Sequence, residues 1–153
     1  MKLKNVLLGL ALLVSTVALA QEKGDFNGFA GLVYPLESDS VLGITGGVEY
    51  VFAEDISFAP SFTYYFSEGE TLTQLDFDLR YYLGNDNFNY FLSGGFASVS
   101  SNNSQGFGIT LTGLTVGGGA LFSIGESFDL ITQVKYNAAW RSVIPMLGVS
   151  FGF

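Results

Sequence analysis

Residues 71–83 read TLTQLDFDLRYYL, and from Gln74 onward polar and apolar side chains alternate. The three charged residues, Asp76, Asp78 and Arg80, occupy alternate positions, with Phe77 and Leu79 between them. Side chains of a β-strand point alternately to its two faces, so this stretch predicts a strand with one charged face and one apolar face.

Residues 128–141, FDLITQVKYNAAWR, repeat the pattern, because Asp129, Lys135 and Arg141 share one parity. If charges fell at random, both stretches would sort their three charges in this way only about one time in sixteen, so a two-residue period is the better explanation. The sequence therefore contains at least two strands that separate charge from apolar surface.

Turn-like clusters rich in Gly, Asn, Asp, Ser and Glu divide the rest of the chain at regular intervals. Seven such connections predict eight strands. Every second connection brings an aromatic-rich segment through a short turn, which favours successive hairpins of one closed sheet. The expected strands lie near residues 25–35, 41–53, 56–67, 71–83, 88–100, 107–124, 128–140 and 143–153.

The size of the apolar side chains decides which face points outward. An eight-stranded barrel encloses only enough space for ordinary side chains, and the many Phe and Tyr residues on the apolar parity would not fit inside it. A closed sheet with an apolar exterior is stable only in lipid. The predicted fold is therefore all-β, a closed antiparallel up-and-down eight-stranded transmembrane β-barrel. The lumen is expected to hold small polar residues and a charge network of Glu49, Asp76, Asp78, Arg80, Asp129, Lys135 and Arg141.

Aromatic residues gather near the strand ends, which is typical of the two interfacial girdles of a membrane barrel. The predicted girdle residues are Tyr50, Phe52, Tyr81, Phe88, Tyr90, Phe128 and Trp140. Three features stay open at this point. The first strand is ambiguous in phase, the sixth changes phase near Gly113 as if bulged, and Pro60 fits its strand only if a bulge lies there.

The N-terminal residues 1–20 have a basic start, an apolar core and a small-residue end, which predicts a signal peptide followed by a single barrel domain over residues 21–153. An uncleaved anchor is the alternative, although the apolar run is short for one. Loss of Lys2 and Lys4 leaves four basic residues against 14 acidic ones, a net charge of −10, which excludes nucleic acid as a partner. The chain contains neither cysteine nor histidine.

The chain ends in PMLGVSFGF, with apolar residues at alternate positions up to a terminal aromatic: Leu147, Val149, Phe151 and Phe153. With this ending the sequence resembles the small eight-stranded outer-membrane β-barrel proteins of Gram-negative bacteria, the class of OmpX and the OmpA membrane domain. The resemblance implies an outer-membrane location, contact with outer-membrane lipids and lipopolysaccharide, insertion by the outer-membrane assembly machinery, and a monomer. The short predicted outer loops differ from those of family members that bind partners through long loops.

The favoured function is a barrel with a salt-bridged, plugged lumen that acts in envelope structure or surface interaction. A narrow pore for small solutes is the alternative, and a soluble periplasmic carrier with reversed phases is a third. Asp76 and Asp78 could form a catalytic carboxylate pair. The enzymes of the resembled superfamily depend on a histidine, however, which this chain lacks, so neither an enzyme nor a cofactor or metal site is expected.

Overall fold

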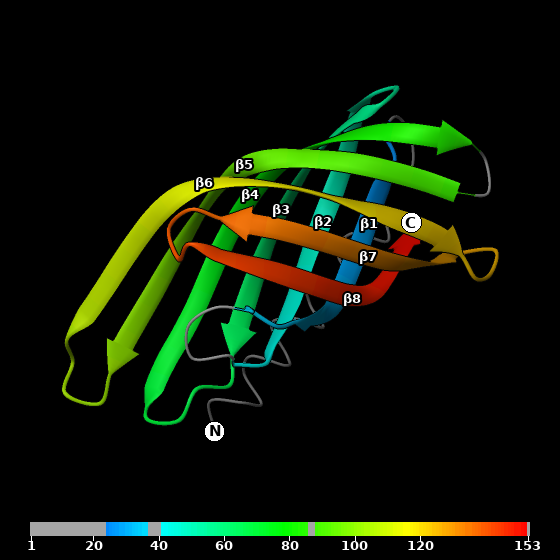
Figure 1. The fold of residues 1–153 in the computed structure, drawn as a ribbon. Coiled ribbons are helices and arrows are strands. Elements are labelled where there is room, and N and C mark those ends of the chain that lie inside the picture. Colours follow the sequence, from blue (N-terminus) through cyan, green and yellow to red (C-terminus); the bar gives the residue numbers. More distant parts are fainter. Residues whose placement is uncertain (1–23, 37–40, 86–87, 153) are drawn as a thin grey trace.

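The computed structural model describes residues 24–36, 41–85 and 88–152, so the predicted signal peptide and Phe153 lie outside the described residues. Eight antiparallel strands close into a barrel in which each strand pairs with its neighbours in sequence (Figure 1). The predicted fold is confirmed. No helix in the described part of the chain is long and apolar enough to cross a membrane. The strands are β1 Phe26–Val33, β2 Gly43–Ala53, β3 Ile56–Tyr65, β4 Glu70–Asn85, β5 Phe88–Asn103, β6 Gly108–Ser123, β7 Phe128–Asn137 and β8 Ser142–Gly152.

The first and last strands close the barrel. β1 pairs with β8 in an uninterrupted antiparallel ladder from Asn27↔Gly152 to Val33↔Met146. Both chain ends of the barrel therefore lie at one end, called here the terminal end, together with the β2–β3, β4–β5 and β6–β7 turns. The other four connections lie at the opposite end, called here the loop end.

The exterior is apolar. On β4, Leu79 is 52% exposed, whereas its neighbours Asp78 and Arg80 are at most 2% exposed. At about 3.3 Å per residue and a strand tilt of about 40°, the apolar row of β4 from Leu75 to Leu83 covers a membrane thickness of about 20 Å. The same separation holds around the barrel, where the exposed apolar side chains include Leu32, Ile44, Val48, Phe62, Leu75, Leu92, Phe96, Val116, Val134 and Leu147.

Most of the predicted girdle at the terminal end is exposed, namely Tyr50, Phe52, Tyr81, Tyr90 and Phe128. The side chain of Phe88 is not among those that the structure describes. The prediction for Trp140 is wrong. Its ring lies 4.9 Å from the ring of buried Tyr65 and packs against the interior. β7 ends at Asn137, and residues 138–141 form a turn, so strand alternation no longer sets the direction of this side chain.

The structure settles the phases of β1 and β6. In β1, Phe29 and Val33 point inward and Leu32 outward. β6 keeps an unbroken register with β5 from Phe88↔Phe122 to Asn102↔Gly108, so there is no bulge at Gly113. Instead, the outer face of β6 changes across Gly113 from the apolar side chains of Leu114 and Val116 to the hydroxyl side chains of Thr110 and Thr112.

The reversal in β6 lies close to the point beyond which β6 is no longer paired with β7 and the sheet extends past the closed barrel. β3 ends at Tyr65, and pairing of β6 with β7 stops at Thr115↔Asn137, but β4, β5 and β6 continue together beyond these points (Figure 1). This part is called here the extension and comprises residues 70–71, 97–103 and 108–113. Its outer face is hydroxylic, with hydrogen bonds between Ser98 and Thr112 and between Ser100 and Thr110.

Pro60 interrupts the β2–β3 ladder without a bulge of its own. β3 stays in register with β4 through Pro60↔Phe77, and the pairs with β2 jump from Gly47↔Ser61 to Tyr50↔Phe58 without a shift. The missing N–H of proline accounts for this local gap. The register shift lies further along β2, between Val51 and Ala53.

Replacement of Leu79 by arginine tests the lipid-facing exterior. We expect Leu79→Arg to lower the free energy of unfolding in phospholipid vesicles by about 2–4 kcal/mol, because its charge would face mid-bilayer hydrocarbon. Ile109→Arg is the matched control, since Ile109 is equally apolar and 66% exposed but lies in the extension. An equal loss of unfolding free energy in the two variants would contradict a membrane belt that includes Leu79 and excludes Ile109.

Candidate functional site: the barrel lumen

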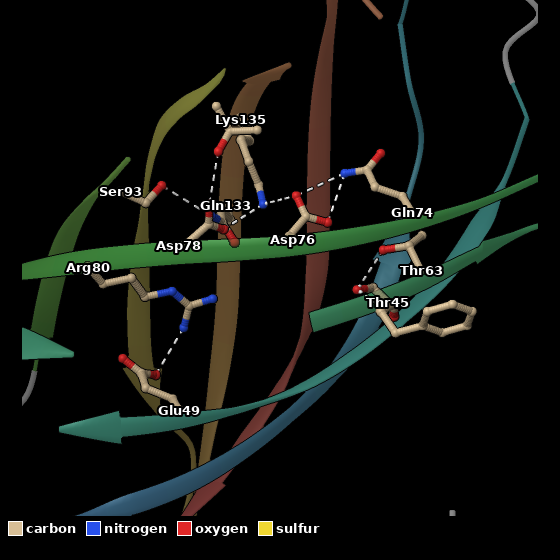
Figure 2. Close-up of polar contacts among 12 residues, drawn as sticks. Thr45, Glu49, Thr63, Gln74, Asp76, Asp78, Arg80, Ser93, Gln133 and Lys135 are labelled. Atoms are coloured by element: carbon tan, nitrogen blue, oxygen red, sulfur yellow. Dashed lines mark hydrogen bonds and ion pairs between the residues drawn. The ribbon is translucent and has the colours of Figure 1, made fainter. Parts of the chain in front are cut away.

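The lumen contains charged side chains from three strands that point toward one another (Figure 2). Glu49 comes from β2, Asp76, Asp78 and Arg80 from β4, and Lys135 from β7. The four side chains from β2 and β4 are at most 2% exposed, and that of Lys135 is 12% exposed. Five of the seven predicted network residues therefore meet inside the barrel, where they form two clusters.

The first cluster surrounds Glu49. Arg80 Nη1 lies 2.9 Å from Glu49 Oε2 in an ion pair (Figure 2). The other carboxylate oxygen, Oε1, accepts hydrogen bonds from the hydroxyls of Ser57 and Tyr82. Glu49 is therefore saturated by one cation and two hydroxyls, as a buried carboxylate requires.

Arg80 is also held between two aromatic rings. Its guanidinium carbon lies 4.7 Å from the ring centroid of Phe29 and 4.7 Å from that of Phe91. Phe29 comes from β1 and Phe91 from β5, so the three side chains cross the bore at this level. Attraction between the cation and the ring faces favours this arrangement, which fills the bore with a charge and two rings.

The second cluster surrounds Lys135. Its Nζ lies 2.8 Å from Asp76 Oδ1 and 2.6 Å from Asp78 Oδ2 (Figure 2). Gln74 Nε2 donates to Asp76, and Thr115 Oγ1 donates to Asp78 over 2.9 Å. Because β4 and β7 are not neighbours in the barrel, these ion pairs span the lumen rather than run along the wall.

Large apolar side chains fill much of the remaining lumen, which the sequence prediction of a small polar interior missed. Phe29, Val33, Tyr65, Phe91, Ile131, Ile144 and Met146 are buried in one cluster, with Trp140 packed against it. A signal was present in the sequence. Phe91 shares the parity of Ser93, and Ile131 shares the parity of Gln133, so strand alternation alone places both inside.

Little space is left in the lumen. The cavity between the apolar cluster and the ion pairs measures about 20 Å³ and is lined by residues that include Phe29, Asp76, Arg80, Lys135 and Met146. A volume of this size holds about one water molecule. The described lumen is therefore a packed core in which ion pairs and apolar side chains alternate.

Two predicted network residues lie away from this core. Asp129 points inward at the terminal end but is partly exposed, and its Oδ1 accepts a hydrogen bond from Ser123 Oγ over 2.8 Å. The prediction for Arg141 is wrong, because Arg141 is exposed in the β7–β8 turn. Its φ of 54° belongs to that turn, which breaks the two-residue period before β8 begins at Ser142.

Three residues of the predicted C-terminal row, Leu147, Val149 and Phe151, lie on the outside of β8, and the fourth, Phe153, lies outside the described residues. Leu147 and Val149 are exposed on the exterior. Phe151 is half-buried, and its ring covers Gly28 on β1 so closely that a Cβ at Gly28 would lie 2.5 Å from it. Phe151 therefore packs across the closing seam of the barrel. Among residues 24–36, 41–85 and 88–152, no group of three or more acidic, histidine or cysteine side chains could hold a metal ion.

Comparison with known proteins agrees with this architecture. No protein-family model matches the sequence, and no curated protein matches it. Among solved structures, the N-terminal β-barrel domain of Pseudomonas aeruginosa OprF is similar, with a TM-score of 0.65 and 19% identity over 86% of this chain and all of that domain. Neisserial surface protein A has a TM-score of 0.63 and 18% identity over 85% of this chain and 97% of its own. A designed transmembrane β-barrel has a TM-score of 0.66 and 15% identity, over 88% of this chain and all of that one. At these identities the likeness establishes the fold alone, that of small transmembrane β-barrels.

Proposed function

We propose that the chain is an outer-membrane protein of a Gram-negative bacterium whose barrel is sealed, and that it acts in envelope structure or surface interaction. Its exterior would contact outer-membrane lipids and lipopolysaccharide, and it would be a monomer within its own membrane. The row of Leu147, Val149, Phe151 and Phe153 would be the segment that the outer-membrane assembly machinery recognises. The apolar exterior and the similar solved barrels support this proposal.

The packing around Arg80 carries the proposal of a sealed lumen. A solute that crosses the barrel has to pass the level at which Phe29, Arg80 and Phe91 are stacked across the bore. It then has to pass the ion pairs of Lys135 with Asp76 and Asp78. A cavity of about 20 Å³ offers no hydrated path past these two levels.

The same contacts argue against a catalytic role for Asp76 and Asp78. Both carboxylates are bound to Lys135, each accepts a further hydrogen bond from Gln74 or Thr115, and both are at most 2% exposed. A general acid or base has to reach the substrate from which it takes, or to which it gives, a proton. Each carboxylate oxygen of these two side chains already accepts a hydrogen bond from the protein itself.

Planar bilayer recordings test the seal. We expect the purified wild-type protein to show no stable conductance. The double variant Arg80→Ala/Phe91→Ala is expected to show small open-channel currents, because it removes two of the three side chains that cross the bore. Arg141→Ala is the matched control, since it removes an exposed arginine outside the lumen, and it should remain silent.

Stable wild-type currents would contradict the sealed barrel and favour a narrow pore for small solutes. Silence of the double variant would show that the Arg80 level does not by itself close the bore. Folding of each variant is checked independently by its heat-dependent migration on gels.

Replacement of Lys135 tests the energetic role of the lumen ion pairs. Lys135→Met leaves Asp76 and Asp78 buried side by side without a cation, and we expect the free energy of unfolding to fall by about 3–5 kcal/mol. Asp129→Asn, at the partly exposed end of the lumen, should change it by less than about 1 kcal/mol. Urea titration in lipid vesicles measures both values. A loss for Lys135→Met no larger than that for Asp129→Asn would contradict a structural role for the cluster.

A further inference from the structure

One strand edge of the extension is unpaired. β5 pairs with residues 108–113 of β6 on one side, but pairing of β6 with β7 begins only at Thr115. The β7–β8 turn reaches β6 where Ala138 N donates to Leu114 O over 2.9 Å. Among the residues that the structure describes, none pairs with residues 108–112 on the side away from β5. This segment of β6 therefore presents a free edge at the loop end.

The free edge lacks the usual protection of an exposed strand. Proteins guard such edges with charges, proline or bulges, because an unpaired edge is a template for another strand. Residues 108–113 read GITLTG, with no charge and no proline, and their register with β5 is unbroken. Ile109 and Leu111 are 66% and 50% exposed on one face of the strand. By contrast, the opposite edge of the extension begins with the charged Glu70 of β4.

The backbone direction along the edge follows from the hydrogen bond at Leu114. Residues of an antiparallel strand direct both backbone polar groups alternately to one neighbour and to the other. Since Leu114 directs its carbonyl toward the β7 side, Gly108, Thr110 and Thr112 direct their N–H and C=O groups to the same, unpaired side. Ile109 and Leu111 are bonded to β5.

We propose that this edge pairs with the same edge of a second copy of the chain, antiparallel and centred on Thr110. In this register Thr110 lies opposite Thr110 of the second copy, and Gly108 lies opposite Thr112, so all the free groups of the three residues are paired. Ile109 then lies opposite Leu111 on the apolar face, and the threonines share the hydroxylic face. The sequence of the edge is thus complementary to itself in both hydrogen bonding and polarity.

Symmetry then decides where the second copy lies. Two antiparallel strands of one sheet are related by a two-fold axis perpendicular to the sheet. The extension continues the barrel wall, so this axis lies in the membrane plane, and rotation about it turns the second barrel upside down. The second copy therefore sits in an opposed membrane. The alternative is a two-fold axis along the membrane normal, which would place both copies in one membrane. Each edge is tilted from the normal by about 40°, so the two edges would then cross at an angle of about 80° and could not form a ladder.

The proposed contact is weak for a single pair of molecules. A ladder of five residues from each copy is far smaller than the interfaces of about 1,200 Å² or more that hold stable complexes. Many copies in two facing membranes would act together, and such multivalency raises the strength of attachment without new contacts. The proposed role is thus homotypic attachment between membranes, which leaves the protein a monomer within its own bilayer.

Disulfide trapping tests the register, because the chain has no cysteine of its own. Two vesicle populations are prepared with Thr110→Cys proteins that carry different tags, then mixed and mildly oxidised. We expect disulfide-linked dimers that carry both tags, since residues directly opposite in a hydrogen-bonded pair lie about 5.5 Å apart at Cα, within reach of a disulfide. Thr112→Cys is the matched control. Its two copies would lie about 14 Å apart, four residues along the ladder, and should not be linked.

Charge exchange provides an independent test by vesicle clustering, read as light scattering. Vesicles with wild-type protein should cluster, whereas vesicles with Thr110→Lys alone or Thr110→Glu alone should not, because like charges would face each other. A mixture of the two variant populations should cluster again. Thr71→Lys, on the β4 side of the extension, should cluster like wild type.

Three outcomes would overturn the proposal. They are equal linking of the two cysteine variants, absence of mixed-tag dimers, and failure of the Lys and Glu populations to cluster when mixed although both proteins are folded. None of these outcomes bears on the sealed lumen, so the two proposals stand or fall separately.

Discussion

Closure of the sheet between β1 and β8 is the constraint on which the rest of the structure depends. In hydrocarbon every backbone N–H and C=O group has to be paired within the protein, and a closed ladder achieves this for strands without leaving an edge. The uninterrupted pairing from Asn27↔Gly152 to Val33↔Met146 supplies this closure. Once the wall is closed, its two faces meet different surroundings. Lipid contacts Leu79 and its neighbours, whereas Asp78 and Arg80 are separated from lipid by the backbone itself.

The lumen acts as the core of the protein although much of it is ionic. Lys135 on β7 binds two carboxylates of β4, and Arg80 on β4 binds Glu49 on β2 and lies between rings from β1 and β5. These contacts join strands that are not adjacent in the wall, which the backbone ladder cannot do. Burial of so many charges is tolerated because each belongs to an ion pair inside the lumen. The wall and its contents therefore stabilise each other.

Much of this arrangement could be predicted from the sequence because a strand has a period of two. Alternation correctly placed Asp76, Asp78, Arg80 and Lys135 inside and Leu75, Leu79 and Val134 outside. It failed for Trp140 and Arg141, where a turn after Asn137 ends the period. The prediction of a small polar lumen also failed, because Phe91 and Ile131 are buried inside the barrel. Gly119 leaves room for the ring of Phe91, since a Cβ at Gly119 would lie 2.4 Å from it.

Partners across the bore, such as Lys135 with Asp78, could not be predicted, since they depend on the stagger of the closed barrel rather than on any local pattern. The reversal of polarity near Gly113 was visible in the sequence. Its meaning was not, because the structure is needed to show that residues 108–113 pair with β5 and not with β7, which places Gly113 at the base of the extension.

Fluorescence quenching by lipids brominated near the middle of their chains tests the central claim most directly. With Trp140 replaced by Phe, the chain has no other tryptophan, so a single new one reports its own surroundings. The orientation described here predicts that tryptophan at Leu79 has blue-shifted emission and is strongly quenched, whereas tryptophan at Ile109 in the extension is not. Unquenched, water-exposed emission from position 79 would contradict an exterior that faces lipid, and with it the assignment of the charged face to the lumen.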